Sequence, residues 1–387
     1  MVKPQDNYDY TTNSGFQKSI ESIPAGVREL LSVMKDRCRG LIPDDKLKKI
    51  KNVVLTGCGD SLCAAYAAKA AFEFFTDLRV DTPYCLELGR HYDSRRFGEE
   101  GETLVLIIST SGLVSRCIEA ARRSNKFGAV TCAVTANSEC EFAQTCDYVM
   151  DMTLTEFWAA RAPGSRNYVG SALALQMLAS EIGLVRGSLS AEDQNAFYAE
   201  ISRYNDEWEK MIPSLYDRFL PLADDWKDVP YFEAVSSGPE FSAAWFTQAK
   251  VFEGINTFAR YENFEDWCHV DYFLRNMDTG MFIYCAKNNP AISRCHEAES
   301  IMDRQNYRYI TVTDDDPASF TRPENVVVVP TSKYVFLHAV FEGVVGCVMI
   351  DCLQRLKGNG YYCSDMIDSY FPFGGSILRN SEIVDAD

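Results

Sequence analysis

Short apolar runs rich in β-branched residues alternate along this chain with segments long enough to form a helix. This alternation predicts parallel strands joined by helical crossovers. The predicted strands are 53–55, 104–109, 130–135 and 148–152 in the first half, and 231–235, 281–285, 309–313 and 326–330 in the second. Successive strands begin 51, 26 and 18 residues apart in the first series, and 50, 28 and 17 apart in the second. The spacing therefore indicates a duplicated α/β unit, with helices on both faces of each parallel sheet.

A helical block separates the two predicted units. Helical periodicity covers 169–181 and then 191–211, after which Pro213 and Pro221 mark the passage into the second unit. A further helix is predicted at 23–38, before the first strand. The expected parts are an N-terminal helical segment at 1–50, a first α/β domain with connecting helices at 51–210, a second α/β domain at 211–357 and a C-terminal tail at 358–387.

The first predicted strand ends in the sequence Gly-Cys-Gly-Asp-Ser, and a long helical pattern follows at once. Gly57 and Gly59 allow backbone conformations that a Cβ would forbid. The N–H groups of the first helical turn have no helical partner, and they carry about half a positive charge. The turn is therefore a candidate anion site, with Ser61 as a hydroxyl donor, although an ordinary strand-to-helix loop has the same composition.

A second turn of this kind follows the second predicted strand. Ser109, Thr110, Ser111 and Gly112 end the run, and a helix is predicted from Val114. The carboxyl ends of neighbouring strands share a crevice in an open α/β sheet. Two such turns on successive strands favour a shared anion site over two unrelated loops.

Composition and charge narrow the class of protein. The chain has 387 residues, 47% of them apolar, which is enough for two hydrophobic cores. A formal charge of −17 makes nucleic acid or an anionic membrane an improbable partner. The fourteen cysteines are scattered without a C-x-x-C pair, so we expect buried free thiols, with Cys132, Cys285 and Cys347 in core runs. The N-terminal sequence has no signal pattern and no run of about 18 uninterrupted apolar residues occurs, which predicts a cytoplasmic protein.

Two segments of the second half carry candidate proton-transfer groups. Lys250 and Glu253 lie three residues apart and so share one face of a predicted helix that begins near Phe241. His269 lies between aromatic and apolar residues and follows Glu265 and Asp266, either of which could orient its ring. The common alternatives are a solvated ion pair for the first segment and a partly buried structural histidine for the second.

Together these motifs resemble the double-SIS (sugar isomerase) family, in particular the isomerase domain of glucosamine-6-phosphate synthase and the fructosamine deglycases. GCGDS is similar to the family's GCGTS turn, STSG to its SQSG turn, and KVFE to its Lys-x-x-Glu helix. His269 follows Glu253 by sixteen residues, as the ring-opening histidine of the family follows its base. The resemblance covers roughly residues 50 to 350. It implies two tandem SIS domains, each a three-layer αβα, flavodoxin-like sheet.

The resemblance also implies roles for particular residues. Glu253 would shuttle a proton between C1 and C2 with Lys250 beside it, and His269 would open the sugar ring in the site of a neighbouring subunit, which implies a homodimer. The implied phosphate and sugar contacts are Gly59, Ser61, Ser109, Thr110, Ser111, Ser115, Glu156, Ser165 and Arg166.

The chain departs from the family pattern at several places. Val114 replaces a phosphate-binding threonine, so that Ser115 is the substitute hydroxyl, and Val270-Asp271 replaces Gly-Pro after the histidine. The tail after Lys357 contains no lysine, whereas the synthase places a tail lysine in its active site. Position 2 is Val2, and the sequence shows no glutaminase domain before the first strand. We therefore do not expect the full synthase reaction.

We therefore expect an enzyme that acts on a phosphorylated ketose or ketosamine. It would be a deglycase if an amine leaves C1 and an aldose–ketose isomerase if nothing leaves, and the missing tail lysine favours the deglycase. No cofactor is expected and no metal-ligand spacing occurs in the sequence. A phosphosugar sensor without chemistry is the main alternative. A nicotinamide-dependent dehydrogenase, with Asp81 on the ribose, explains less, because Leu62 replaces the third glycine of its motif. The sequence does not name the sugar or the leaving amine.

Overall fold

The computed structural model describes residues 15–155, 162–274, 278–358, 360–363 and 381–386. The chain forms two compact units. The N-terminal unit comprises 25–156, 167–202 and 371–387, and the C-terminal unit comprises 1–24, 157–166 and 203–370. Because each unit combines separate stretches of sequence, the continuous domain limits expected above stay a prediction.

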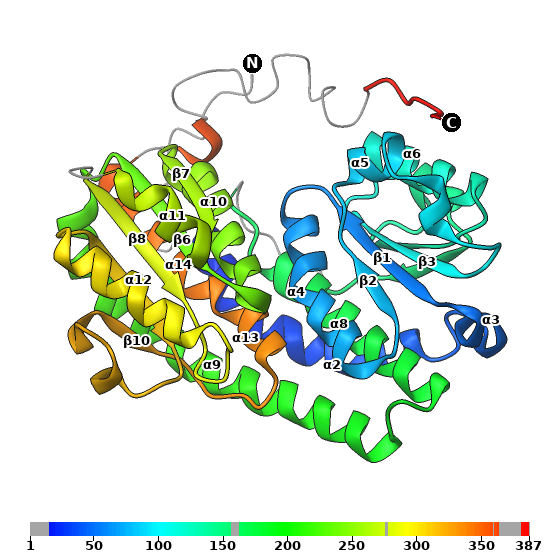
Figure 1. Ribbon diagram of the computed structural model, residues 1–387, viewed down its shortest axis with the longest axis horizontal. Helices are drawn as coiled ribbons and strands as arrows, with labels where there is room; N and C mark the ends of the chain where they lie inside the picture. The colour runs from blue at the N-terminus through cyan, green and yellow to red at the C-terminus, as the bar shows by residue number, and fades with distance from the viewer. Residues whose placement is uncertain (1–14, 156–161, 275–277, 359, 364–380, 387) are drawn as a thin grey trace. The chain divides into compact units, whose positions relative to one another are not determined.

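The N-terminal unit is built on a five-stranded parallel sheet (Figure 1). Its strands lie in the order β2-β1-β3-β4-β5, which is the flavodoxin-like order. They are β1 (Asn52–Gly57), β2 (Arg79–Asp81), β3 (Thr103–Ile108), β4 (Val130–Thr135) and β5 (Tyr148–Asp151). All four strands predicted for this half are confirmed. The added strand, β2, is a three-residue edge strand with two charged side chains, and it gives no apolar run.

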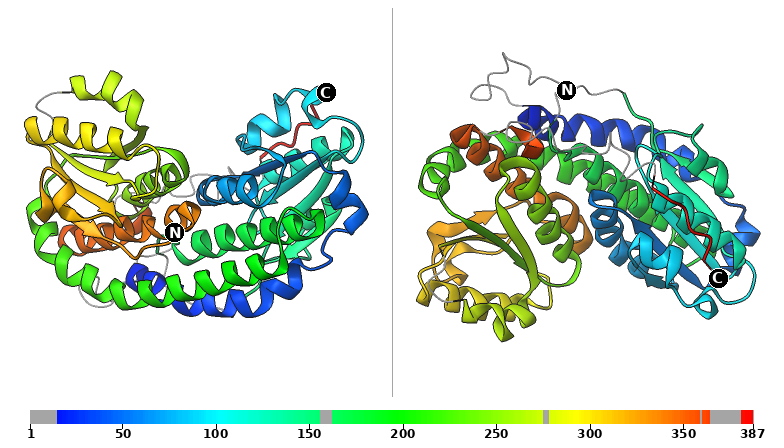
Figure 2. Two further views of the ribbon diagram at one scale, coloured as in Figure 1. Left: turned by 60° about the horizontal axis from the view of Figure 1, so that its bottom comes forward. Right: turned by 90° about the horizontal axis from the view of Figure 1, so that it is seen from above.

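Helices cover both faces of this sheet (Figure 2). On one face α5 and α6 bury Leu88, Cys117 and Ala121 against Val105 and Ile107 of the sheet. On the other face α8 packs on α4, where the Gln176 side chain donates to the Ala67 carbonyl at 3.1 Å. The helices of this unit are α2 (Ile23–Cys38), α3 (Asp44–Lys49), α4 (Asp60–Phe75), α5 (Cys85–Arg90), η1 (Ser94–Phe97), α6 (Ser115–Lys126), α7 (Glu141–Thr145) and α8 (Arg166–Arg186).

The C-terminal unit repeats the same architecture. Its parallel strands lie in the order β10-β9-β8-β6-β7, so that, counted within each unit, both sheets have the order second, first, third, fourth, fifth. They are β6 (Tyr231–Ser236), β7 (Phe258–Asn263), β8 (Thr279–Tyr284), β9 (Arg308–Thr313) and β10 (Val326–Val328). The predicted duplication and the predicted fold class are both confirmed. The sequence missed β7, an edge strand that contains Arg260 and Glu262.

Helices also cover both faces of the second sheet. On one face α11 and α12 bury Trp267 and Met302 against Met281 and Ile283, and α10 packs with α14 on the other. The elements are α1 (Gly15–Glu21), α9 (Ala191–Trp226), η2 (Gly238–Glu240), α10 (Phe241–Ile255), α11 (Phe264–His269), η3 (Asp271–Phe273), α12 (Ile292–Arg304), η4 (Pro317–Ser319), η5 (Pro323–Asn325), α13 (Val335–Phe341), α14 (Gly343–Lys357) and η6 (Tyr361–Cys363).

The long helix α9 corrects one expectation. It continues through Pro213 and Pro221, where the sequence predicted an end. Each proline removes one backbone N–H donor. Both prolines lie on the exposed side, whereas Trp208, Phe219 and Trp226 are buried on the other. Packing of the apolar face therefore holds the helix together across both prolines.

Two helical segments are long and apolar enough to cross a membrane by length and composition alone. They are 166–186 and 335–357, and 83% and 94% of their most apolar windows are buried inside the protein. Such burial is typical of core helices that cover parallel sheets.

Candidate functional site

The two hydroxyl-containing turns of the N-terminal unit leave the sheet at neighbouring positions. In the parallel register of β1 and β3, Gly57 pairs with Ile108. The residue after each of these, Cys58 and Ser109, therefore opens its turn at the same edge of the sheet. The strand ends thus bring together the two motifs that the sequence singled out.

The structure explains why glycine occupies both positions of the first turn. Gly59 caps α4 with φ of +56°, a conformation that side chains with a Cβ rarely adopt. A Cβ on Gly57 would lie 2.8 Å from the Cβ of Ser61 and 3.0 Å from the Ile108 carbonyl oxygen. The turn is therefore compact against β3, and it presents the start of α4 with Ser61 half-buried in the first turn.

The hydroxyls of the second turn differ in accessibility. Thr110 is half-buried and Ser111 is exposed, and the Ser111 Oγ accepts a hydrogen bond from the Leu113 N–H at 3.3 Å. Ser109 and Ser115 are both only 3% exposed. The Ser109 side chain lies within hydrogen-bonding reach of the buried Cys117 thiol. Ser61, Thr110 and Ser111 are consequently the hydroxyls best placed to meet a ligand from solvent.

Lys250 and Glu253 form an ion pair on α10 in the C-terminal unit. The Lys250 Nζ lies 2.6 Å from the Glu253 Oε2. The lysine is fully buried, with its ammonium 4.7 Å from the centre of the Phe246 ring, while 27% of the Glu253 side chain is exposed. A carboxylate that reaches solvent above a buried ammonium differs from the solvated surface pair considered above.

His269 is the last residue of α11, and 67% of its side chain is exposed. Its Nε2 lies 2.9 Å from the Glu265 Oε1, and the other Glu265 oxygen lies 2.8 Å from the Arg294 Nε. The hydrogen bond with His269 lowers the pKa of Glu265, and the charge of Arg294 acts in the same direction. Of the two carboxylates that precede the histidine, Glu265 is the one that pairs with the ring.

A buried carboxyl pair anchors the segment that carries His269. Asp271 is 2% exposed and lies 2.8 Å from the Arg260 guanidinium, which also lies 3.3 Å from the Glu233 carboxylate of β6. Glu233 also accepts the indole N–H of Trp267 in α11 at 3.2 Å. Burial, followed by the neighbouring Asp271, raises the pKa of Glu233 to about 8. Asp271, which departs from the family's Gly-Pro, therefore has a structural role here.

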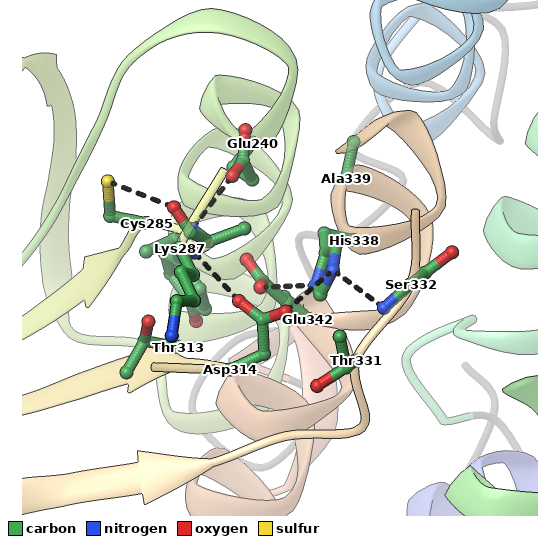
Figure 3. A network of polar contacts seen from close by, with 12 residues as sticks. Glu240, Cys285, Lys287, Thr313, Asp314, Thr331, Ser332, His338, Ala339 and Glu342 are labelled. Carbon is green, nitrogen blue, oxygen red and sulfur yellow. Dashed lines mark hydrogen bonds and ion pairs between the residues drawn. The ribbon is translucent and has the colours of Figure 1, made fainter. Parts of the chain in front are cut away.

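The strand ends of the C-terminal unit are filled by the protein's own carboxyl groups (Figure 3). Glu240 is fully buried and accepts hydrogen bonds from the Ala286 N–H and the Asn289 side chain, both at 2.9 Å. Buried His338 lies 3.1 Å from Glu342 and 3.6 Å from Asp314. A phosphate dianion at this edge would face three carboxyl groups, in contrast to the hydroxyl-lined edge of the N-terminal unit.

The pKa values in this network are displaced by burial and by neighbouring charge. Desolvation raises the pKa of Glu240 to about 8, and it also raises the pKa of Glu342. Burial alone would lower the pKa of His338, but the hydrogen bond with Glu342 and the nearby carboxylate charges together raise it. Sequence reasoning missed this network. The spacing of His338 and Glu342, four residues apart on a helical face, was the one local signal for it.

The third predicted set of sugar contacts is only partly described. Glu156 lies outside the described residues. Ser165 is fully buried, with its Oγ 3.0 Å from the Ser19 Oγ, and Arg166 is the first residue of α8. The contact of these residues with a sugar stays a prediction.

A cavity of about 670 Å³ lies at the opposite edge of the N-terminal sheet, where β1 and β2 begin. Its walls are basic, but Arg96 and Arg186 are each paired with a carboxylate, Asp81 and Asp77, at 2.7 and 2.8 Å. We place the candidate site at the strand ends with the hydroxyls, because the turns there offer a helix N-terminus and glycine backbone.

The last described segment of the chain, 381–386, lies along α6 of the N-terminal unit. The Arg116 guanidinium donates to the Ser381 Oγ at 3.1 Å, and the Val384 N–H donates to the buried Glu119 carboxylate at 2.8 Å. Ile383 packs on the apolar cluster beneath the two turns. This segment of the tail is therefore tied to the unit that carries the hydroxyl-lined turns.

Comparison with known proteins gives partial sequence relatives and full-length structural ones. No family model matches the chain. It is 23% identical over 218 residues to the isomerizing glutamine–fructose-6-phosphate aminotransferase of Corynebacterium diphtheriae, and 25% identical over 169 residues to that of Methanosarcina mazei. The alignments cover 55% and 44% of this chain, but only 34% and 26% of those proteins.

Solved structures match nearly the whole chain. The C-terminal domain of glucosamine-fructose-6-phosphate aminotransferase from Francisella tularensis has a TM-score of 0.78 at 14% identity, over 92% of this chain and 99% of that one. The tagatose-6-phosphate ketose/aldose isomerase of Escherichia coli has a TM-score of 0.70 at 14% identity, over 93% and 97%. The chain therefore has the fold of these phosphosugar enzymes, and its partial sequence relatives agree with the double-SIS (sugar isomerase) resemblance of its motifs.

Proposed function

We propose that this protein is an enzyme that moves a proton between C1 and C2 of a phosphorylated ketose or ketosamine, and that side chains rather than a metal ion carry out the transfer. Of the two outcomes, deglycation of a ketosamine 6-phosphate is favoured over aldose–ketose isomerisation. The segment after Lys357 contains no lysine to serve as the synthase's tail lysine does.

The observation that carries phosphosugar binding is the register of Gly57 with Ile108. This register places the glycine turn at the start of α4 beside the turn after β3, which carries accessible hydroxyls. A phosphate there would receive backbone N–H groups, the helix dipole and the hydroxyls of Ser61, Thr110 and Ser111. This local field is needed because the chain as a whole has a formal charge of −17.

Glu253 is the proposed general base. A carboxylate can take a proton from one carbon and return it to the next, and the partial exposure of Glu253 leaves its oxygens accessible. The buried Lys250 ammonium, 2.6 Å away, holds the carboxylate in position and favours its charged form. In the deglycase, loss of the C1 proton gives an enolamine, and return of the proton to C2 gives an imine at C1. Water then adds to C1, the carbon–nitrogen bond breaks, and the free amine and the aldose phosphate are released.

His269 is the proposed ring-opening acid and base, acting in the site of a second subunit. Its exposure supports this role, because an exposed ring is accessible to a neighbouring subunit. The same segment exposes Val270, Phe273 and Leu274 at 62%, 63% and 45%. Clustered exposed apolar side chains are typical of protein–protein interfaces, which supports a homodimer. The proposed enzyme is cytoplasmic and has no nucleic-acid or membrane partner.

The test is direct incubation with phosphorylated sugars. Fructoselysine 6-phosphate and related ketosamine 6-phosphates should release free amine, measured by derivatisation and mass spectrometry. Fructose 6-phosphate should be tested for conversion to the aldose. Release of amine supports the deglycase, and isomerised sugar alone supports the isomerase. Absence of both products across the panel would refute the proposed chemistry.

A further inference from the structure

The fold brings three cysteines together beneath the first hydroxyl-lined turn. Cys58 lies in that turn, Cys85 is the first residue of α5, and Cys117 is in the first turn of α6. Their sulfur atoms all lie within 4.8 Å of one another, and those of Cys85 and Cys117 are 3.8 Å apart. Because neighbouring members of the set lie 27 residues or more apart, no local sequence pattern indicates this cluster.

The sulfur spacing matches a metal site better than a disulfide. A disulfide requires sulfur atoms about 2.05 Å apart. Tetrahedral zinc–thiolate bonds of about 2.3 Å place the sulfur atoms about 3.8 Å apart. The distance between Cys85 and Cys117 already has this value, so these two thiolates could bind one ion without backbone movement.

A hydroxyl adjoins the cluster. The Ser109 side chain is 97% buried and lies within hydrogen-bonding reach of the Cys117 thiol. Because metal binding removes the thiol proton, the Ser109 oxygen would then be available to the ion as a fourth donor.

The surroundings suit an ion held by three thiolates. Binding of a divalent ion by three thiols releases three protons and leaves a complex with a net charge of −1. The Arg116 guanidinium, close to Cys58, would offset that charge. Cys85 and Cys117 are fully buried, and Ile383 packs on the same cluster, whereas Cys58 is half-buried and leaves a path for entry.

We propose that Cys58, Cys85 and Cys117, with the Ser109 hydroxyl, form a binding site for one thiophilic metal ion of the Zn²⁺ or Cu⁺ class. Thiolate ligands select these soft ions over Mg²⁺ and Ca²⁺. Because Cys58 lies between the two glycines of the candidate phosphate turn, the ion would fix the conformation of that turn. Metal binding itself does not depend on the proposed enzymatic function.

The experiment uses the full chain, reduced and stripped of metal by a chelator. Titration with Cd²⁺ should produce an ultraviolet thiolate-to-metal charge-transfer band that saturates at one ion per chain. The affinity for Zn²⁺ is measured by competition with a chromophoric chelator. Cd²⁺ should displace bound Zn²⁺, and Mg²⁺ should not. Cys85→Ala and Cys117→Ala should each weaken binding by about 100-fold or more, since each removes a ligand. Cys132→Ala, which changes an equally buried cysteine of β4, should leave binding unchanged.

A second measurement on the unaltered protein covers the case in which a variant does not fold. Alkylation with and without Zn²⁺, mapped by mass spectrometry, should show metal protection confined to the three cysteines of the cluster. Three results would overturn the proposal: no saturable charge-transfer band, equal loss of binding in Cys132→Ala, or protection at other cysteines. Ready formation of a disulfide within the cluster, without metal affinity, would also overturn it and identify a redox pair.

Discussion

The ammonium of Lys250 lies 2.6 Å from the carboxylate of Glu253, and the two groups differ sharply in exposure. The lysine is fully buried and the glutamate keeps 27% of its side chain exposed. A buried charge is stable only when it is paired and hydrogen-bonded. The pair therefore stabilises the buried Lys250 and leaves the Glu253 carboxylate accessible to a ligand.

Replacement of the proposed base should separate binding from chemistry. We expect Glu253→Gln to lower kcat by about 10²- to 10⁴-fold, because the amide cannot accept the proton. The affinity for the phosphosugar should change little. Glu192→Gln, at an exposed glutamate of α9, is the control. If Glu253→Gln retains full turnover, Glu253 is not the base. If the wild-type protein binds phosphosugars without turnover and the variant behaves identically, the protein is a sensor.

Removal of a hydroxyl from the turns should weaken phosphate binding. Ser61→Ala and Ser111→Ala should each raise the Kd of a 6-phosphosugar by about 10- to 100-fold, the value of a hydrogen bond to a charged group. Calorimetry measures this, with the unphosphorylated sugar as a ligand control. Ser319→Ala, at an exposed serine of the C-terminal unit, should have no effect. Unchanged affinity in both turn variants would place the phosphate elsewhere.

Mixing of two inactive variants tests whether subunits share a site. If His269 serves the neighbouring subunit, a heterodimer of Glu253→Gln and His269→Ala has one intact site and one doubly defective site. Random reassociation should then restore about a quarter of wild-type activity, because half of the dimers are mixed and each carries one good site. If both residues act within one chain, every site is defective and mixing restores nothing.

The carboxyl pair beneath His269 predicts a pH dependence of stability. The pKa of Glu233 is raised in the folded state to about 8, so the folded protein binds this proton more tightly than the unfolded chain does. Its stabilising effect is fully present below about pH 4.5 and is lost as the pH rises through about 8.

Glu233→Gln should remove this dependence, because its amide can donate to Asp271 as the protonated acid does. Denaturant unfolding of the C-terminal unit between pH 5 and pH 9 should show a loss of a few kcal/mol in the wild type and a flatter profile in the variant. Parallel profiles for the two proteins would contradict the assignment of the proton to Glu233.

The sequence predicted the elements whose signal is local. Eight of the ten strands among the described residues follow from apolar runs, and both turns follow from glycines and hydroxyls at strand ends. The two missed strands, β2 and β7, lie next to the first strand of each sheet and contain charged residues. The helix α9 was predicted too short, because a buried apolar face outweighs the local cost of Pro213 and Pro221.

Contacts between distant segments could not be predicted from the sequence. Nothing local relates Glu233 to Asp271, or Cys58 to Cys85 and Cys117, because each group assembles only when the sheet forms. The burial of Ser109 and Ser165 was also hidden, since a serine in a turn is usually exposed. The motifs thus located the candidate site, and the fold decides which of its residues a ligand can reach.

The central claim is that one phosphosugar uses the turns of the N-terminal unit and the carboxylate of Glu253. A crystal structure with a bound 6-phosphosugar tests it most directly. The account predicts the phosphate at Gly59, Ser61 and Ser111, with C1 and C2 within hydrogen-bonding reach of Glu253. A phosphate bound away from these turns, or carbons remote from Glu253 in every subunit of the assembly, would contradict it.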